Sequence, residues 1–193
     1  MNSEIDCQAK AREFESIHGQ AALIDRFCKF DIARPYPSVI GLAVDNHGRF
    51  PIFYRTAAVR SARNAWSMPS GLHEAGRSVE AQFSTELAEE LNLKAIPGSI
   101  VKVGFYENIV FDKPDEPNNW HWVNLLVAVA VETLECIRNM EPEKHSGLTI
   151  VTLDELFDRL LDEKQQWTPG LREALLEHDR SLNEVVSALS FRD

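Results

Sequence analysis

The residues best suited to chemistry are three glutamates, Glu86, Glu89 and Glu90, near the middle of the 193-residue chain. They stand at positions i, i+3 and i+4, a spacing that places side chains on one part of a helix surface. Carboxylates grouped in this way repel one another, at a cost of about 0.2–0.5 kcal/mol per pair even when exposed. A bound cation would offset this cost, and oxygen ligands suit a hard ion such as Mg²⁺ or Mn²⁺.

An acidic cluster on a helix is most often a solvated face, but the helical wheel argues against that interpretation here. At about 100° per residue, the apolar side chains sweep an arc of roughly 0–120°: Val79, Phe83, Leu87, Leu91. Glu90 falls at roughly 20°, inside this arc, and Glu86 at roughly −20°, on its edge. Glu89 lies a little farther out. The carboxylates are therefore not where solvation would place them, which favours a metal site.

A loop and a helix must position these glutamates. Gly71 begins the loop, and Ser78 is placed to cap the helix, because its hydroxyl can accept hydrogen bonds from first-turn amides. Asn92 stands where the helix should stop. Polar residues at 56–65 and the segment from Trp66 to Ser70 lead into the loop. We expect no regular structure there.

Apolar, β-branched segments on both sides of this helix predict strands, at 38–44, 50–55, 100–110, 120–131 and 148–151. The first two should form a hairpin, with Pro51 at an edge or strand start, and the strand at 120–131 should be central. Thr152 and Glu155 form a capping box for a helix to about residue 163. Pro169 predicts the start of a last helix that runs to 189.

These segments predict an α/β (α+β) fold, a mixed β-sheet with helices on its faces. Residues 1–33 read as an N-terminal helical extension, and residues 34–193 as the main domain, including C-terminal helices. Such terminal helices exceed what a central fold needs, so a homodimer is plausible. We expect the extension to have a structural role, packed on the domain or on a partner subunit.

The composition limits the class of protein. Thirty acidic residues against twenty basic ones give a formal net charge of −10, which argues against binding to the phosphate backbone of long nucleic acid. A small phosphorylated ligand is compatible, because a metal can meet its charge. No apolar run approaches the roughly 20 residues of a membrane span, and the charged N-terminus lacks a secretory signal. Three widely spaced cysteines indicate reduced thiols, so we expect a cytoplasmic protein without membrane partners.

The stretch from Gly71 to Leu93 resembles the signature of the Nudix hydrolase family, G-x5-E-x7-R-E-U-x-E-E-x-G-U, where U is a bulky aliphatic residue. The matching residues are Gly71, Glu86, Leu87, Glu89, Glu90 and Leu93, and the surrounding Trp66, Pro69, Glu74 and Gly76 also look like the family. Three positions depart: Arg77 replaces a Glu, Thr85 an Arg and Asn92 a Gly. In the family, that Glu and Arg brace the loop against the helix. Here both are replaced, so neither is left as a lone buried charge.

The resemblance covers roughly residues 34–160, by flanking pattern. It implies a Nudix-like α/β/α sandwich, with residues 34–193 as the Nudix domain. It further implies hydrolysis of a diphosphate linkage in a nucleoside diphosphate joined to X. Glu86, Glu89, Glu90 and the Gly71 carbonyl would hold Mg²⁺ or Mn²⁺, and Glu89 or Glu86 would be the catalytic base. Segments at 34–35, 121–123 and 141–144 look like the branch that hydrolyses oxidised nucleoside triphosphates of the 8-oxo-dGTP type.

Several residues are candidates for binding the substrate, each with a plainer alternative: Arg34, Glu74, Arg77, Trp120, His121, Trp122. The two indoles share one face of their strand and could stack on a base, or belong to the sheet core. His121 is a base contact or a surface histidine. Arg34, like Arg60 and Arg63, could meet phosphates.

The charged loop residues Glu74 and Arg77 also have two interpretations each. Arg77 binds phosphate or pairs with a nearby acid. Glu74 acts on the metal through water or is an exposed loop acid, and Glu141 and Glu143 are read as loop charge. The departures from the signature leave an alternative function, a nucleotide-binding regulator with weakened catalysis.

Overall fold

The computed structural model describes residues 35–59, 61–110 and 120–190. By its contacts the chain divides into two compact units. The larger comprises Tyr36–Asn108 and Trp122–Asp193 and holds the site described below. The smaller comprises Met1–Pro35 and Ile109–His121, and most of it is outside the described residues. The helical extension expected at 1–33 lies outside them too and stays a prediction.

The strands of the described residues form two sheets, of four and three strands. The first has the order β4-β1-β6-β5 and the second β3-β2-β7. Their bounds are β1 Tyr36–Val44, β2 Phe50–Arg55, β3 Ala65–Ser67, β4 Ser70–Leu72, β5 Val101–Val110, β6 Trp120–Ala130 and β7 His145–Val151. β1 runs parallel to β6 and antiparallel to β4, so the first sheet is mixed, as expected, and β6 is an inner strand.

The expected hairpin of the first two strands is wrong, because β1 and β2 belong to different sheets. β1 pairs with β6 on one edge and β4 on the other, while β2 pairs with β3 and β7. The turn between them is organised by the buried Asp45, whose carboxylate accepts hydrogen bonds from the amides of His47 and Arg49, both at 2.9 Å. Pro51 lies at the start of β2, but β2 is not an edge strand.

The acidic helix α3 spans Val79–Leu91, as predicted. Ser78 caps its start, accepting a hydrogen bond from Ala81 N at 3.1 Å. Asn92 ends it in the left-handed conformation, with φ 55°, which asparagine tolerates better than most residues. Both ends of the helix are therefore encoded locally.

The C-terminal segment forms α4 Leu153–Leu161, α5 Leu171–Glu177 and α6 Asp179–Ser190. The Thr152–Glu155 capping box is present. The single last helix expected at 169–189 is wrong, because the structure has two helices there. α5 begins after Gly170 (φ 77°) and ends at His178, and α6 follows it. Tertiary contacts accompany both interruptions: Gly170 packs against Tyr106, and the His178 ring lies where a Cβ on Gly104 would be.

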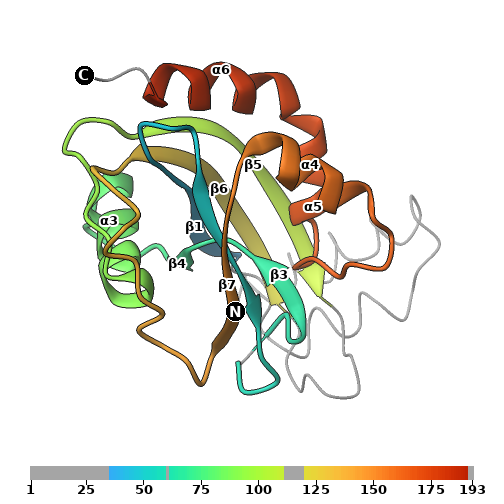
Figure 1. Cartoon of the computed structure of the whole chain (residues 1–193). Helices are drawn as coiled ribbons and strands as arrows, with labels where there is room; N and C mark the ends of the chain where they lie inside the picture. The colour runs from blue at the N-terminus through green and yellow to red at the C-terminus, as the bar shows by residue number, and fades with distance from the viewer. Residues whose placement is uncertain (1–34, 60, 111–119, 191–193) are drawn as a thin grey trace, which may run out of the picture. The chain divides into compact units, whose positions relative to one another are not determined.

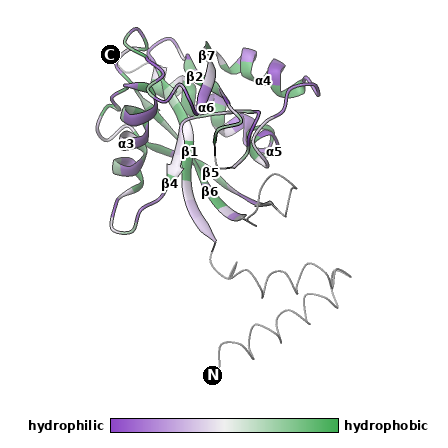
Figure 2. Ribbon diagram, turned by 90° about the horizontal axis from the view of Figure 1, so that it is seen from below, coloured by the Kyte–Doolittle hydropathy of each residue, from purple (hydrophilic) through white to green (hydrophobic). Residues whose placement is uncertain are grey.

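Helices cover both faces of the strands, which confirms the α/β/α arrangement. α3 lies on one side, and α4, α5 and α6 on the other (Figure 1). Alternate residues of β1 face opposite ways: Val39 and Ala43 join the core under α3, and Ile40, Leu42 and Val44 join the core under the C-terminal helices. Figure 2 shows the mixture of hydrophilic and hydrophobic residues along α3 that this one-sided burial requires.

The short strands β3 and β4 were not expected from the sequence. β4 is decisive for the site, because it pairs Gly71 with Val39 of β1 and so fixes the start of the glycine loop on the sheet. Among the described helices, none has the length and apolar character needed to cross a membrane.

Candidate metal and substrate site

Helix α3 directs its glutamates as the helical wheel predicts. Glu90 is buried, with 6% of its surface exposed, Glu86 is half-buried and Glu89 is exposed. All three line a cavity of about 440 Å³. Its other walls come from Ser70 of β4, Arg55 of β2 with the loop after it, and the segment that leads into β7: Arg55, Ala58, Val59, Ser70, Glu141, Lys144, His145.

Gly71 lies directly against Glu86. A Cβ at position 71 would overlap the Glu86 carboxylate, so the backbone here can approach only because the residue is glycine. Glu86 is thereby held beside the loop. Burial raises the pKa of its carboxyl above the ordinary value, and the hydrogen bond from Gln82 acts in the opposite direction.

Glu90 is the buried acid of the cavity. Its Oε2 accepts a hydrogen bond from the amide of Ser70 at 3.1 Å. Burial raises the pKa of Glu90 to about 8, the Ser70 bond lowers it, and the neighbouring Glu86 adds to the rise. A buried carboxyl of this kind ionises most readily when a cation arrives.

Gln82 connects the glycine loop to the helix, a role that sequence reasoning missed. Its side chain is buried, with 2% exposed. Its Nε2 donates to Glu86 Oε1 at 2.7 Å, and its Oε1 accepts from the amide of Glu74 at 3.2 Å. The i, i+4 spacing of Gln82 and Glu86 is the sequence signal that could have revealed the contact.

Two of the three replaced signature positions, Arg77 and Thr85, do not line the cavity. Arg77 pairs with Glu74 at 3.0 Å on the surface of the loop, and both side chains are exposed. Thr85 donates its hydroxyl to the carbonyl of Ala81 at 2.9 Å, within its own helix. The expected brace is thus absent, and Gln82 joins loop and helix instead.

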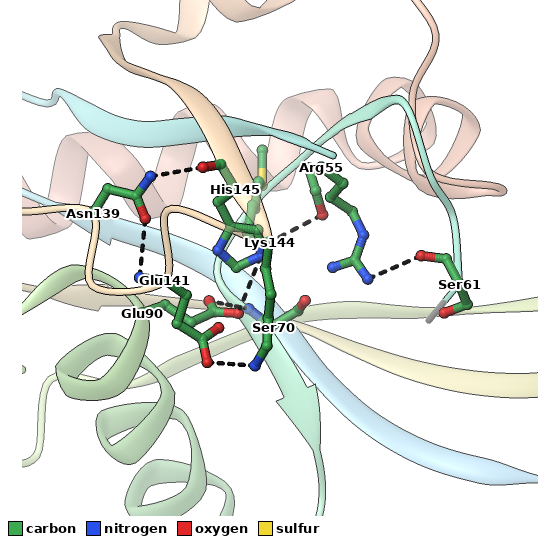
Figure 3. A network of polar contacts seen from close by, with 10 residues as sticks. Arg55, Ser61, Ser70, Glu90, Asn139, Glu141, Lys144 and His145 are labelled. Carbon is green, nitrogen blue, oxygen red and sulfur yellow. Dashed lines mark hydrogen bonds and ion pairs between the residues drawn. The ribbon is translucent and has the colours of Figure 1, made fainter. Parts of the chain in front are cut away.

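Glu141 and His145 complete the cavity lined by the three glutamates, called here the carboxylate cavity. The sequence pattern alone indicates no more than loop charge for Glu141. Glu90, Glu141 and His145 each offer a ligand atom, and these atoms lie within 4.8 Å of one another. Figure 3 shows the group together with Lys144, whose ammonium pairs with the Glu141 carboxylate. Burial lowers the pKa of His145 to about 4, and the charge of Arg55 contributes. No spacing in the sequence links these residues to α3.

A second cavity, of about 170 Å³, adjoins the first, since Arg55 and Ser70 line both. Trp122 forms part of its wall and packs against Tyr36, with ring centroids 5.6 Å apart. Three polar side chains in the wall form a chain of hydrogen bonds: Ser38 Oγ donates to Asn124 Oδ1, and Asn124 Nδ2 donates to Asn108 Oδ1. The cavity therefore combines an aromatic surface with amides.

The other predicted substrate residues that the structure describes do not line these cavities. Arg34 and Arg60 lie outside the described residues, as does the side chain of Trp120. His121 belongs to β6 and is half-buried. Arg63 donates to the carbonyl of Val59 at 2.8 Å. Of the predicted substrate residues, Trp122 is the one that lines a described cavity.

Comparison with known proteins identifies the fold. The fold of the chain is similar to that of solved MutT and Nudix structures. The MutT protein from Methanosarcina mazei Go1 is 18% identical, with a TM-score of 0.52 over 76% of this chain and 95% of that one. A MutT NUDIX hydrolase from Burkholderia pseudomallei is 19% identical, with a TM-score of 0.53 over 79% and 98%.

A NUDIX hydrolase from Nitrosomonas europaea agrees, at 16% identity and a TM-score of 0.53 over 77% of this chain and 90% of that one. No family model matches the sequence, and no curated protein matches it. The chain has the Nudix fold.

Proposed function

We propose that the protein is a metal-dependent hydrolase that cleaves a diphosphate linkage in a nucleoside diphosphate joined to X. A modified nucleoside triphosphate, such as an oxidised dGTP, is the first substrate class to test. One observation carries this proposal: a cavity walled by glutamates adjoins a cavity walled by an indole and amides, and Arg55 and Ser70 line both. A charged diphosphate fits the first cavity, and a base fits the second.

The residues present fit a divalent cation such as Mg²⁺ or Mn²⁺. Glu90 is a buried carboxyl without a cationic partner within hydrogen-bonding distance in the described residues, and Glu86 and Glu89 share its cavity. Together with the Gly71 carbonyl, these carboxylates would hold the ion. When bound, such an ion neutralises charge on phosphate oxygens and makes water more acidic.

The protein's own residues would perform the other tasks. Glu89 is exposed at the cavity, so it is free to accept a proton from the attacking water, with Glu86 as the second candidate. Gln82 and Gly71 hold Glu86 in place. Arg55 lies where the two cavities meet and is suited to a phosphate oxygen. Trp122 offers a stacking surface for the base.

The alternative, a nucleotide-binding regulator without turnover, was suggested by Arg77 and Thr85. Neither side chain lines the carboxylate cavity. Gln82 supports Glu86 where the signature has a Glu and an Arg that this chain lacks. These contacts favour the active hydrolase. Cytoplasmic location and a homodimer remain predictions.

The test is hydrolysis by the full chain with Mg²⁺ or Mn²⁺. Canonical and oxidised nucleoside triphosphates, nucleotide sugars and dinucleotides are supplied, and the released phosphate, pyrophosphate and nucleotide are identified. Glu89→Gln should lower kcat about 100-fold or more if this group is the base. Glu163→Gln, at an exposed position after α4, is the matched control and should retain activity. Nucleotide binding without turnover under every metal and pH would instead establish the regulator.

A further inference from the structure

The imidazole of His145 is buried without a full set of hydrogen bonds. Its side chain is 3% exposed and stacks on Phe53, with ring centroids 4.0 Å apart and an interplanar angle of 26°. Nδ1 is buried and has no hydrogen-bond partner among the described residues. Nε2 lies 3.9 Å from Glu90 Oε1, which is too far for a hydrogen bond. The large majority of buried side-chain polar atoms are hydrogen-bonded, so this ring lacks a partner that it could have.

The loop before β7 holds His145 and Glu141 together. His145 N donates to the Glu141 carbonyl at 2.9 Å. Asn139 Nδ2 donates to the His145 carbonyl at 2.7 Å, and Asn139 Oδ1 accepts from Glu141 N at 3.1 Å (Figure 3). The backbone positions of both residues are therefore fixed relative to each other. Met140 N donates to the Glu90 carbonyl at 2.9 Å, which joins this loop to α3, and the Glu90 carboxylate is held by Ser70.

One ion can reach all three side chains. Their ligand atoms lie within 4.8 Å of one another. Two metal–ligand bonds of about 2.0–2.3 Å span at most about 4.6 Å, so a small adjustment of the side chains would bring all three atoms to one ion. Two carboxylate oxygens and one imidazole nitrogen make a mixed donor set, unlike the carboxylates of Glu86 and Glu89 alone.

We propose that Glu90, Glu141 and His145 form a cation position with mixed oxygen and nitrogen ligands, and that it makes the protein select Mn²⁺ over Mg²⁺. Imidazole suits transition ions, whereas Mg²⁺ prefers oxygen and gives up its water reluctantly. The inference deepens the proposed function and rests on it, because both use Glu90.

The charges around this position allow a bound ion to replace the Lys144 ammonium beside Glu141. The Lys144 ammonium pairs with Glu141, and about half of the Lys144 side chain is exposed. It can therefore move into solvent when an ion binds Glu141. Arg55 and Glu86 also act on Glu90 electrostatically, with opposite signs.

Pulsed EPR of Mn²⁺ bound to the full chain tests the position directly. The wild-type protein should show coupling of Mn²⁺ to a histidine nitrogen, and labelling histidine with ¹⁵N should change its frequency. His145→Gln should remove the coupling. His47→Gln, at an exposed histidine in the turn after β1, should keep it.

Calorimetry supplies the second readout. His145→Gln should weaken Mn²⁺ binding about tenfold or more, on the scale of lost metal-site support, and change Mg²⁺ binding much less. Mn²⁺ bound without nitrogen coupling in the wild type, or an unchanged Mn²⁺/Mg²⁺ ratio in the variant, overturns the proposal. The wild-type spectrum does not depend on whether the variant folds. If the wild-type protein shows the nitrogen coupling but hydrolyses none of the nucleotides supplied, the proposed function is contradicted instead.

Discussion

The backbone of Gly71 lies against the carboxylate of Glu86, with no room for a Cβ between them. β4 brings the loop to this point by pairing Gly71 with Val39, and α3 brings Glu86 from the other direction. The glycine is therefore a spatial requirement of the carboxylate cavity, independent of any left-handed backbone conformation.

Gly71→Ala should displace Glu86 and weaken Mn²⁺ binding about tenfold, a loss typical of disturbed support at a metal site. Calorimetry with Mn²⁺ measures the effect, and thermal melting measures the stability of each variant. Because the overlap is with the Glu86 side chain, Gly71→Ala should cost much less stability when Glu86→Ala is already present. Equal costs in the two backgrounds would show that the contact is not the cause.

Gln82→Leu should shift metal binding to higher pH. The hydrogen bond from Gln82 lowers the pKa of Glu86 against the effect of burial, so its loss raises that pKa further. Titration of Mn²⁺ affinity between pH 5 and 8 would show the shift. Thr85→Ala, which loses a hydroxyl bonded within α3, is the control and should leave the curve in place. An unmoved curve for Gln82→Leu would rule out this positioning role.

Trp122→Ala should raise KM for a nucleoside triphosphate with little change in kcat. Stacking of a base on an aromatic ring is worth about 1–3 kcal/mol, which predicts roughly a 5- to 150-fold increase. Steady-state kinetics separate the two constants. Phe105→Ala removes an aromatic side chain of β5 that is 67% exposed and lines neither cavity, so KM should stay constant there.

The metal-free protein should lose stability between pH 6.5 and 8. In this range the folded chain keeps a proton on Glu90, whose pKa is about 8, whereas the unfolded chain, with an ordinary value of 4.5, has lost it. The folded state binds more protons, so the free energy of unfolding falls as pH rises.

Below pH 6.5 the unfolded chain protonates His145 while the folded chain, with a pKa of about 4, does not. That effect destabilises the folded state as pH falls and opposes the contribution of Glu90. Urea unfolding in the presence of a chelator at several pH values measures the profile. Glu90→Gln should flatten the decline above pH 6.5, and Glu163→Gln should preserve it. A decline that persists in Glu90→Gln would assign it to another group.

Local features of the chain were predictable, and long-range ones were not. The ends of α3 and the burial of Glu90 follow from Ser78, Asn92 and the 3.6-residue period. The break at His178 could not be foreseen, because its ring meets Gly104 on a distant strand. His145 is placed by the register of β7 on β2, where it pairs with Arg55, and no local pattern encodes that register.

The shared wall of the two cavities has a thermodynamic consequence. Since Arg55 and Ser70 border both spaces, and the Ser70 amide donates a hydrogen bond to Glu90, an ion bound in one space would change the surroundings of a ligand bound in the other. Any such coupling must be reciprocal: the factor by which Mn²⁺ tightens nucleotide binding equals the factor by which nucleotide tightens Mn²⁺ binding. Ser70, which contacts Glu90 and lines both cavities, would then transmit this coupling between a bound ion and a bound base.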